Sequence, residues 1–141
     1  MTIVDTNVLL YAVNADDPHH AAARTWLERA LSGAEIVGFG WVVLLGFIRI
    51  ATSGAFRTPI SADRACGLVD EWLDQPTARV IEPGPGHLGK LRQLLMASGT
   101  AGSLVNDAHL ATLAFAHRAT LTSFDRDFLR FEGLEVVVPR G

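Results

Sequence analysis

Short runs of apolar residues recur along this chain, and segments with helical periodicity separate them. The runs lack regular alternation of polar and apolar side chains, which is typical of strands buried on both faces of a sheet. Parallel strands need a crossover between them, and the intervening segments are long enough to supply helices. We therefore predict an α/β fold with a central parallel sheet flanked by helices in three layers. Its five strands are expected at residues 2–4, 35–39, 78–83, 119–124 and 134–139.

Capping and helix-breaking residues mark the ends of the expected helices. A helix should begin at Thr6 and be broken by "NADDPHH" at residues 14–20, where Pro18 suits the first turn of the next helix, ending near Leu31. Ser61 is expected to be an N-cap, and Gly99 should end a helix. Further helices are expected over 41–52, 61–75, 84–99 and 103–118, with a short turn or helix over 125–131.

Composition indicates a single domain spanning residues 1–141. Hydrophobic residues make up 49% of the 141 positions, enough for a substantial core. Cys66 cannot form an intrachain disulfide and is expected to be buried, because it lies in an apolar stretch. No segment resembles a signal peptide or is long enough to span a membrane. A cytoplasmic location without membrane association is therefore expected.

The net charge of −3 and the pI of about 5.9 argue against a protein coated in basic charge for nucleic acid. They exclude neither a local basic patch nor a metal-dependent nuclease, whose site would itself be acidic. Arg49 and Arg57 are the candidates for contacts with RNA phosphates, and surface salt bridges are the alternative.

Acidic residues fall where sites occur in parallel sheets, at the carboxyl ends of strands. Asp5 ends the first expected strand, Asp125 and Asp127 follow the fourth, and Asp107 lies near the start of the preceding helix. If the first and fourth strands are neighbours, these carboxylates converge and repel one another unless a cation binds. Oxygen ligands alone favour Mg²⁺ or Mn²⁺, which activate water and neutralise charge on a phosphoryl group. Taken alone, Asp5 and Asp125 could instead be helix caps, Asp127 a cap or a solvated acid, and Asp107 a first-turn acid favoured by the helix dipole.

Other polar residues have less specific surroundings. Thr6 and Asn7 follow Asp5 directly and are candidates to position its carboxylate. His87, His109 and His117 are scattered, and none has a partner that would make it a general base or a member of a catalytic triad. His109 is expected to be structural. The tryptophans are expected in the core or at a dimer interface.

Three motifs, "IVDTNVLLYA", "NDAHLATLA" and "ATLTSFDRDFLRF", resemble those of a PIN domain. Their order and spacing, and the length of the chain, are similar to the VapC toxins of bacterial type II toxin–antitoxin pairs. The resemblance implies a Mg²⁺-dependent endoribonuclease that cleaves tRNA, rRNA or mRNA and inhibits translation and growth, with Mn²⁺ able to substitute. It also implies a cytosolic homodimer inhibited by a VapB-like antitoxin. Matched position by position, Asp5, Asp107 and Asp125 are the catalytic and metal-binding acids, and Asp127 is a further acid that could reach the metal through water.

One position departs from the family pattern. Gly46 stands three residues before Arg49, where the family usually has a glutamate. A second metal ion could then bind weakly or only with RNA, or the chain could be a degenerate module that binds RNA or a protein without cutting. A phosphotransfer enzyme with Asp5 as nucleophile ranks last. Asn7 occupies the place where that chemistry usually has a second acid, and Lys90 is the only lysine.

Overall fold

The computed structural model describes residues 1–99 and 101–140, and its strands form one parallel sheet. The sheet order is β3-β2-β1-β4-β5, so the chain adds strands first on one side of β1 and then on the other. The strand order therefore reverses between β1 and β4, the place where open α/β sheets bind ligands. The predicted five-stranded parallel sheet is confirmed. Its strands are β1 (Thr2–Val4), β2 (Val37–Gly40), β3 (Ala78–Ile81), β4 (Thr120–Thr122) and β5 (Val136–Val137).

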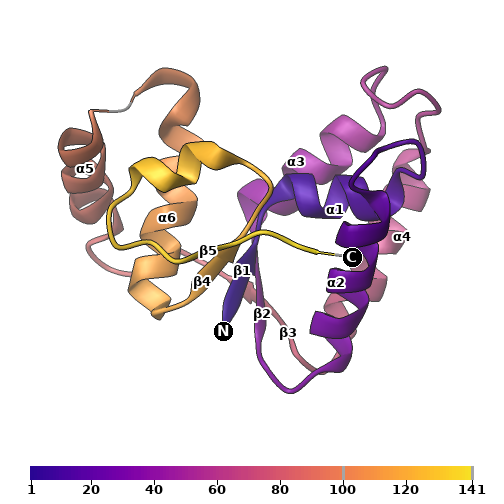
Figure 1. The fold of residues 1–141 in the computed structure, drawn as a ribbon, viewed down its shortest axis with the longest axis horizontal. Coiled ribbons are helices and arrows are strands. Elements are labelled where there is room, and N and C mark those ends of the chain that lie inside the picture. Colours follow the sequence, from indigo (N-terminus) through magenta and orange to yellow (C-terminus); the bar gives the residue numbers. More distant parts are fainter. Residues whose placement is uncertain (100, 141) are drawn as a thin grey trace.

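Helices cover both faces of this sheet. Figure 1 shows α1 to α4 on one side and α5, α6 and the short helix η2 on the other, which gives the expected three layers. Within the described residues, no helix is long and apolar enough to cross a membrane. The helices are α1 (Thr6–Val13), α2 (His20–Ser32), α3 (Trp41–Ala51), α4 (Ala62–Leu73), α5 (His87–Ser98), α6 (Val105–His117) and the 3₁₀ segments η1 (Gly102–Leu104) and η2 (Arg126–Arg130).

The core lies between the sheet and the helices. Ile3 and Phe39 are fully buried on β1 and β2, as the continuous apolar runs require. On the α3 side, the rings of Phe47 and Trp72 meet edge to face, with centroids 4.8 Å apart. This contact joins α3 to α4.

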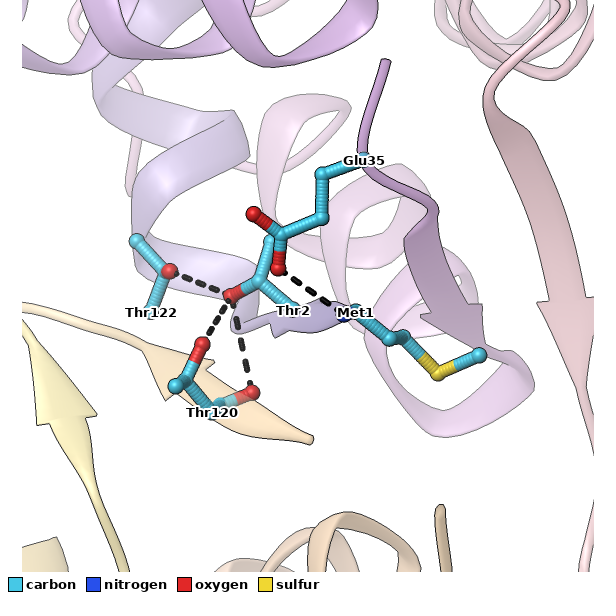
Figure 2. Close-up of polar contacts among 5 residues, drawn as sticks. All are labelled: Met1, Thr2, Glu35, Thr120 and Thr122. Carbon is cyan, nitrogen blue, oxygen red and sulfur yellow. Dashed lines mark hydrogen bonds and ion pairs between the residues drawn. The ribbon is translucent and has the colours of Figure 1, made fainter. Parts of the chain in front are cut away.

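A chain of threonine hydroxyls fixes the pairing of β1 with β4 (Figure 2). The hydroxyls of Thr2 and Thr122 are 2.8 Å apart, and the Thr120 hydroxyl donates to that of Thr2 at 2.9 Å. Beside them, the α-amino group of Met1 forms an ion pair with Glu35 at 2.8 Å. A shift of one residue would turn the threonines to the opposite face, so these bonds favour a single register.

The predicted helix ends are partly confirmed. The Ser61 hydroxyl accepts the Arg64 amide N–H at 3.0 Å, and Gly99 ends α5 with a left-handed φ of 67°. Pro18 was wrongly placed inside α2, which begins only at His20. An Asp17 carboxylate oxygen accepts the His19 amide N–H at 2.8 Å, so this segment forms a turn ahead of the helix.

One expectation about side chains is wrong. Cys66 is exposed, because it lies on the outer face of α4, away from the buried Ala65, Val69 and Trp72. His87 and His109 contact each other instead of a catalytic partner: His87 Nε2 lies 2.9 Å from His109 Nδ1 and links α5 to α6. The tryptophans differ in exposure: Trp72 is buried in the core, whereas Trp41 on α3 is 49% exposed.

The packing of α3 gives a prediction with an internal control. Phe47→Ala should lower the free energy of unfolding by about 3–5 kcal/mol, because it removes a fully buried ring and leaves Trp72 without its partner. Leu129→Ala, at a leucine that is 70% exposed on η2, should change it by less than about 0.5 kcal/mol. Urea denaturation followed by circular dichroism measures both, and equal losses would contradict this packing.

Candidate functional site

Asp5 ends β1 at the switch in strand order, and its carboxylate is held by three donors. Oδ1 accepts the Thr6 amide N–H at 2.7 Å and so caps α1. Oδ2 accepts the Ser123 hydroxyl at 2.7 Å and the Asn7 side-chain amide at 3.2 Å. With Asp5 only 9% exposed, these bonds offset much of the cost of burying its charge. The helix cap therefore explains the position of Oδ1 only. Oδ2 binds Ser123, which follows β4.

Ser123 and Asn7 connect the ends of the two central strands. The Ser123 oxygen also accepts the Asp125 amide N–H at 2.9 Å, and the Asn7 oxygen accepts the Phe124 amide N–H at 3.2 Å. Sequence analysis missed Ser123, although a polar residue between a buried strand and a predicted site acid was an available signal. Asn7 contacts Asp5 through its side chain. The Thr6 hydroxyl instead donates to the Val43 carbonyl at 3.2 Å.

Three further carboxylates meet beside this junction. Asp107, Asp125 and Asp127, all half-buried, offer oxygens that lie within 4.8 Å of one another. Asp125 Oδ1 accepts the Asp127 amide N–H at 2.8 Å and begins η2, while Asp127 forms an ion pair with Arg130 at 3.2 Å. No side chain within residues 1–99 and 101–140 donates a hydrogen bond to Asp107 or forms an ion pair with it. Asp107 is thus the least compensated member of the group.

The electrostatics reflect this crowding of acids. Burial raises the pKa of Asp107 to about 6, and repulsion from Asp125, Asp5 and Asp127 adds to the shift. Burial also raises the pKa of Asp5, although the Ser123 and Thr6 hydrogen bonds act in the opposite direction. A cation bound among these oxygens would relieve the repulsion. The donor set, oxygen only, fits a hard divalent ion.

Asp5, Asp107 and Asp125 line one cavity of about 310 Å³ between α1, α3, α6 and the end of β4. Arg49 lines the same cavity, whereas Arg57 lies in the exposed loop after α3 and is not part of the lining. Asp127 adjoins the cavity through its neighbours Asp107 and Asp125 rather than by lining it. Sequence analysis also missed two polar lining residues close to Asp107, Ser103 and Asn106.

Gly46 lines this cavity too, on the side formed by α3. A Cβ atom at position 46 would lie 3.1 Å from the Thr6 hydroxyl oxygen, so the glycine allows the close approach of α1 to α3. The position where the family resemblance expects a carboxylate therefore does face the acids. A side chain placed there would have to displace the Thr6 hydroxyl by a few tenths of an ångström.

Comparisons with known proteins show which family this chain resembles. Residues 2–134 match the family described as PIN domain. Ribonuclease VapC37 of Mycobacterium tuberculosis is 50% identical over 135 residues, covering 95% of this chain and 94% of the relative. Ribonuclease VapC33 of the same species is 38% identical over 140 residues, covering 99% and 98%.

Solved structures share the fold. VapBC2 from Rickettsia felis, bound to a DNA fragment from its promoter, superposes with a TM-score of 0.71 at 20% identity, covering 99% of this chain and 98% of that one. M. tuberculosis VapC20, a toxin that cleaves the sarcin–ricin loop, gives 0.70 at 19% identity, covering 96% and 98%. From its sequence match, its relatives and its sheet, the chain belongs to the PIN-domain family, among the VapC-type members.

Proposed function

We propose that this protein is a metal-dependent endoribonuclease and the toxin of a type II toxin–antitoxin pair. The observation that carries the proposal is the convergence of Asp5, Asp107 and Asp125 on one cavity at the switch in strand order. Relatives up to 50% identical over nearly the whole chain carry the name ribonuclease. In this proposal residues 1–141 act as one PIN domain.

Asp107 and Asp125 are the proposed direct ligands of Mg²⁺, for which Mn²⁺ could substitute, with Asp5 and Asp127 reaching the ion directly or through water. When bound, the ion would activate a water molecule and neutralise charge on the phosphodiester. Ser123 and Asn7 would hold the Asp5 carboxylate in one orientation while RNA enters.

The two arginines have different proposed roles. Arg49 lines the acid cavity and would hold an RNA phosphate against the carboxylates. Arg57 would contact the RNA backbone outside the cavity, from its exposed loop. The substrate would be tRNA, rRNA or mRNA, and its cleavage would inhibit translation and growth.

The proposed partners are a VapB-like antitoxin and a second copy of the chain, in the cytoplasm. Solved structures of similar fold include VapBC complexes from Rickettsia felis and Haemophilus influenzae, which supports the antitoxin. Apolar side chains on the outer helix faces support a homodimer. They include Trp41 and Leu45 on α3, at 49% and 57% exposure, and Leu88 and Met96 on α5, at 68% and 77%.

A second candidate function is a PIN module that binds RNA or a protein without cutting. Gly46 favours it, since one expected carboxylate is absent from the cavity. The two candidates differ in whether discrete RNA ends appear.

Purified protein incubated with total cellular RNA should produce discrete new ends with Mg²⁺ and none with EDTA. Asp5→Asn and Asp107→Asn should each lower the cleavage rate by on the order of 10²-fold or more, because each removes a charge from the site. Asp70→Asn, at an exposed acid on α4, is the matched control and should cleave like wild type. Mapping the ends by sequencing tests this, and binding without cleavage would favour the second candidate.

The charge on Asp107 should also affect how the free energy of unfolding depends on pH. Its native pKa of about 6 lies above the ordinary 3.8, so the native state binds more protons between these values and loses stability as pH rises through them. Asp107→Asn removes this loss. Solvent screens part of the effect because Asp107 is half-buried.

In metal-free buffer, the melting temperature of Asp107→Asn should match wild type near pH 4 and exceed it by about 2–4 °C at pH 7, the shift expected from ~1 kcal/mol. Scanning calorimetry across this range measures the difference, with Asp70→Asn as the control. A lower melting temperature at pH 7 would show that the Asp107 charge stabilises the first turn of α6 instead.

Position 46 can be tested by restoring the absent charge. Wild type should bind Mn²⁺ weakly when free and more tightly with RNA, whose phosphate oxygens add ligands. Gly46→Glu should raise the affinity of the free protein on the order of tenfold, since ligand charge and number set the affinity of hard cations. Gly46→Gln makes the same 3.1 Å approach to Thr6 without the charge and should leave the affinity near wild type. Isothermal titration calorimetry with Mn²⁺ measures these affinities. Equal affinities for the two variants would show that a carboxylate at position 46 does not reach the metal ion.

A further inference from the structure

Three aromatic rings from separate parts of the chain pack together close to the acid cavity. Tyr11 comes from α1, His19 from the turn before α2, and Phe124 from the segment after β4. The ring centroids are 5.4 Å apart for Tyr11 and His19, 5.2 Å for Tyr11 and Phe124, and 4.6 Å for His19 and Phe124. We call Tyr11, His19 and Phe124 the aromatic ledge.

The ledge is joined to the acid site through Phe124. This residue stands between Ser123, which binds Asp5, and Asp125, which lines the cavity. Its amide N–H donates to Asn7, itself a lining residue. The pKa of Tyr11 is raised by burial and then by the charges of Asp17, Asp125 and Asp5, so its phenol lies within electrostatic reach of the site. The Phe124 backbone and the Tyr11 phenol therefore lie beside the acid site.

Local hydrogen bonds hold the ledge in place and leave one member open to solvent. The His19 amide N–H donates to Asp17, and His20 Nδ1 lies 2.8 Å from the Tyr11 carbonyl oxygen. Tyr11 and Phe124 are half-buried, whereas His19 is exposed. A ring held in this way loses little freedom when a flat ligand stacks on it.

The charge around the ledge indicates which part of a nucleic acid fits. Asp16 and Asp17 both lie shortly before His19 in the chain, and their carboxylates would repel a phosphate group. A nucleobase is flat and uncharged, and unpaired RNA bases commonly stack on aromatic side chains, histidine included. The ledge thus differs from Arg49, which suits a phosphate.

We propose that the aromatic ledge is a subsite for an unpaired base of the RNA, adjacent to the phosphate held at the acid cavity. This inference rests on the proposed ribonuclease function and refines it. The substrate must present at least one unstacked nucleotide beside the bond to be cut, and stacking accepts any base because every base has an aromatic face.

Binding of a labelled RNA, measured separately from cleavage, tests the ledge. The probe is an unstructured single strand of about 12 nucleotides, within the span that single-strand-binding surfaces cover. Fluorescence anisotropy gives its affinity in EDTA and in Ca²⁺. Loss of one stacking contact should make His19→Ala bind roughly tenfold more weakly, and His19→Trp should restore binding. His117→Ala, an exposed histidine at the opposite end of α6 from Asp107, should bind like wild type.

A second probe with abasic central nucleotides keeps the phosphates and removes the bases. On this probe His19→Ala and wild type should bind within about twofold, because no base is left to stack. Melting temperatures of all variants check that the fold is intact. The ledge is overturned if wild type binds neither probe, if His19→Trp fails to restore binding, or if the loss in His19→Ala persists on the abasic probe.

The outcomes for the ledge and for the nuclease are separable. Cleavage of cellular RNA with an unchanged affinity of His19→Ala refutes the ledge and leaves the nuclease standing. Base-dependent binding with no cleavage supports the ledge and refutes the nuclease. If His19→Ala binds RNA normally but forms a weaker complex with a protein partner, the face belongs to that partner and the proposal is wrong.

Discussion

The buried hydrogen bond between the Ser123 hydroxyl and Asp5 Oδ2 is the contact on which the site depends. It joins the ends of β1 and β4, the strands between which the sheet order reverses. The same serine oxygen accepts the Asp125 amide N–H, so one side chain positions the acids that follow both strands. Without the serine, Asp5 would lose a donor in a setting where an unpaired buried charge is costly. The threonine pairs further down these strands keep the register that makes the contact possible.

The sheet and the strand-end acids could be predicted because they follow from local patterns. Continuous apolar runs indicate strands covered on both faces, and Asp5 and Asp125 stand directly after such runs. The convergence of the acids was conditional on β1 lying beside β4, which no local pattern determines. The position of Gly46 on the cavity likewise required the packing of α3 against Thr6.

Side-chain partners were harder to predict, for two physical reasons. Ser123 and the pair His87 and His109 meet residues far away in sequence, and only the packed helices and strands bring them together. Cys66 is different, because the spacing of Ala65, Val69 and Trp72 already marks the inner face of α4 and excludes position 66. The apolar neighbours of the cysteine predict burial, whereas helical geometry places it on the outer face.

The contact between Asp5 and Ser123 spans 118 positions of the chain, and this separation has a consequence for synthesis. During synthesis Asp5 is made well before Asp107, Ser123 and Asp125, the residues that complete the acid site. Contacts of such long range form late, after the intervening helices and strands have been made. A partly synthesised chain therefore has no assembled acid site, and the proposed ribonuclease activity would be absent until β4 pairs with β1.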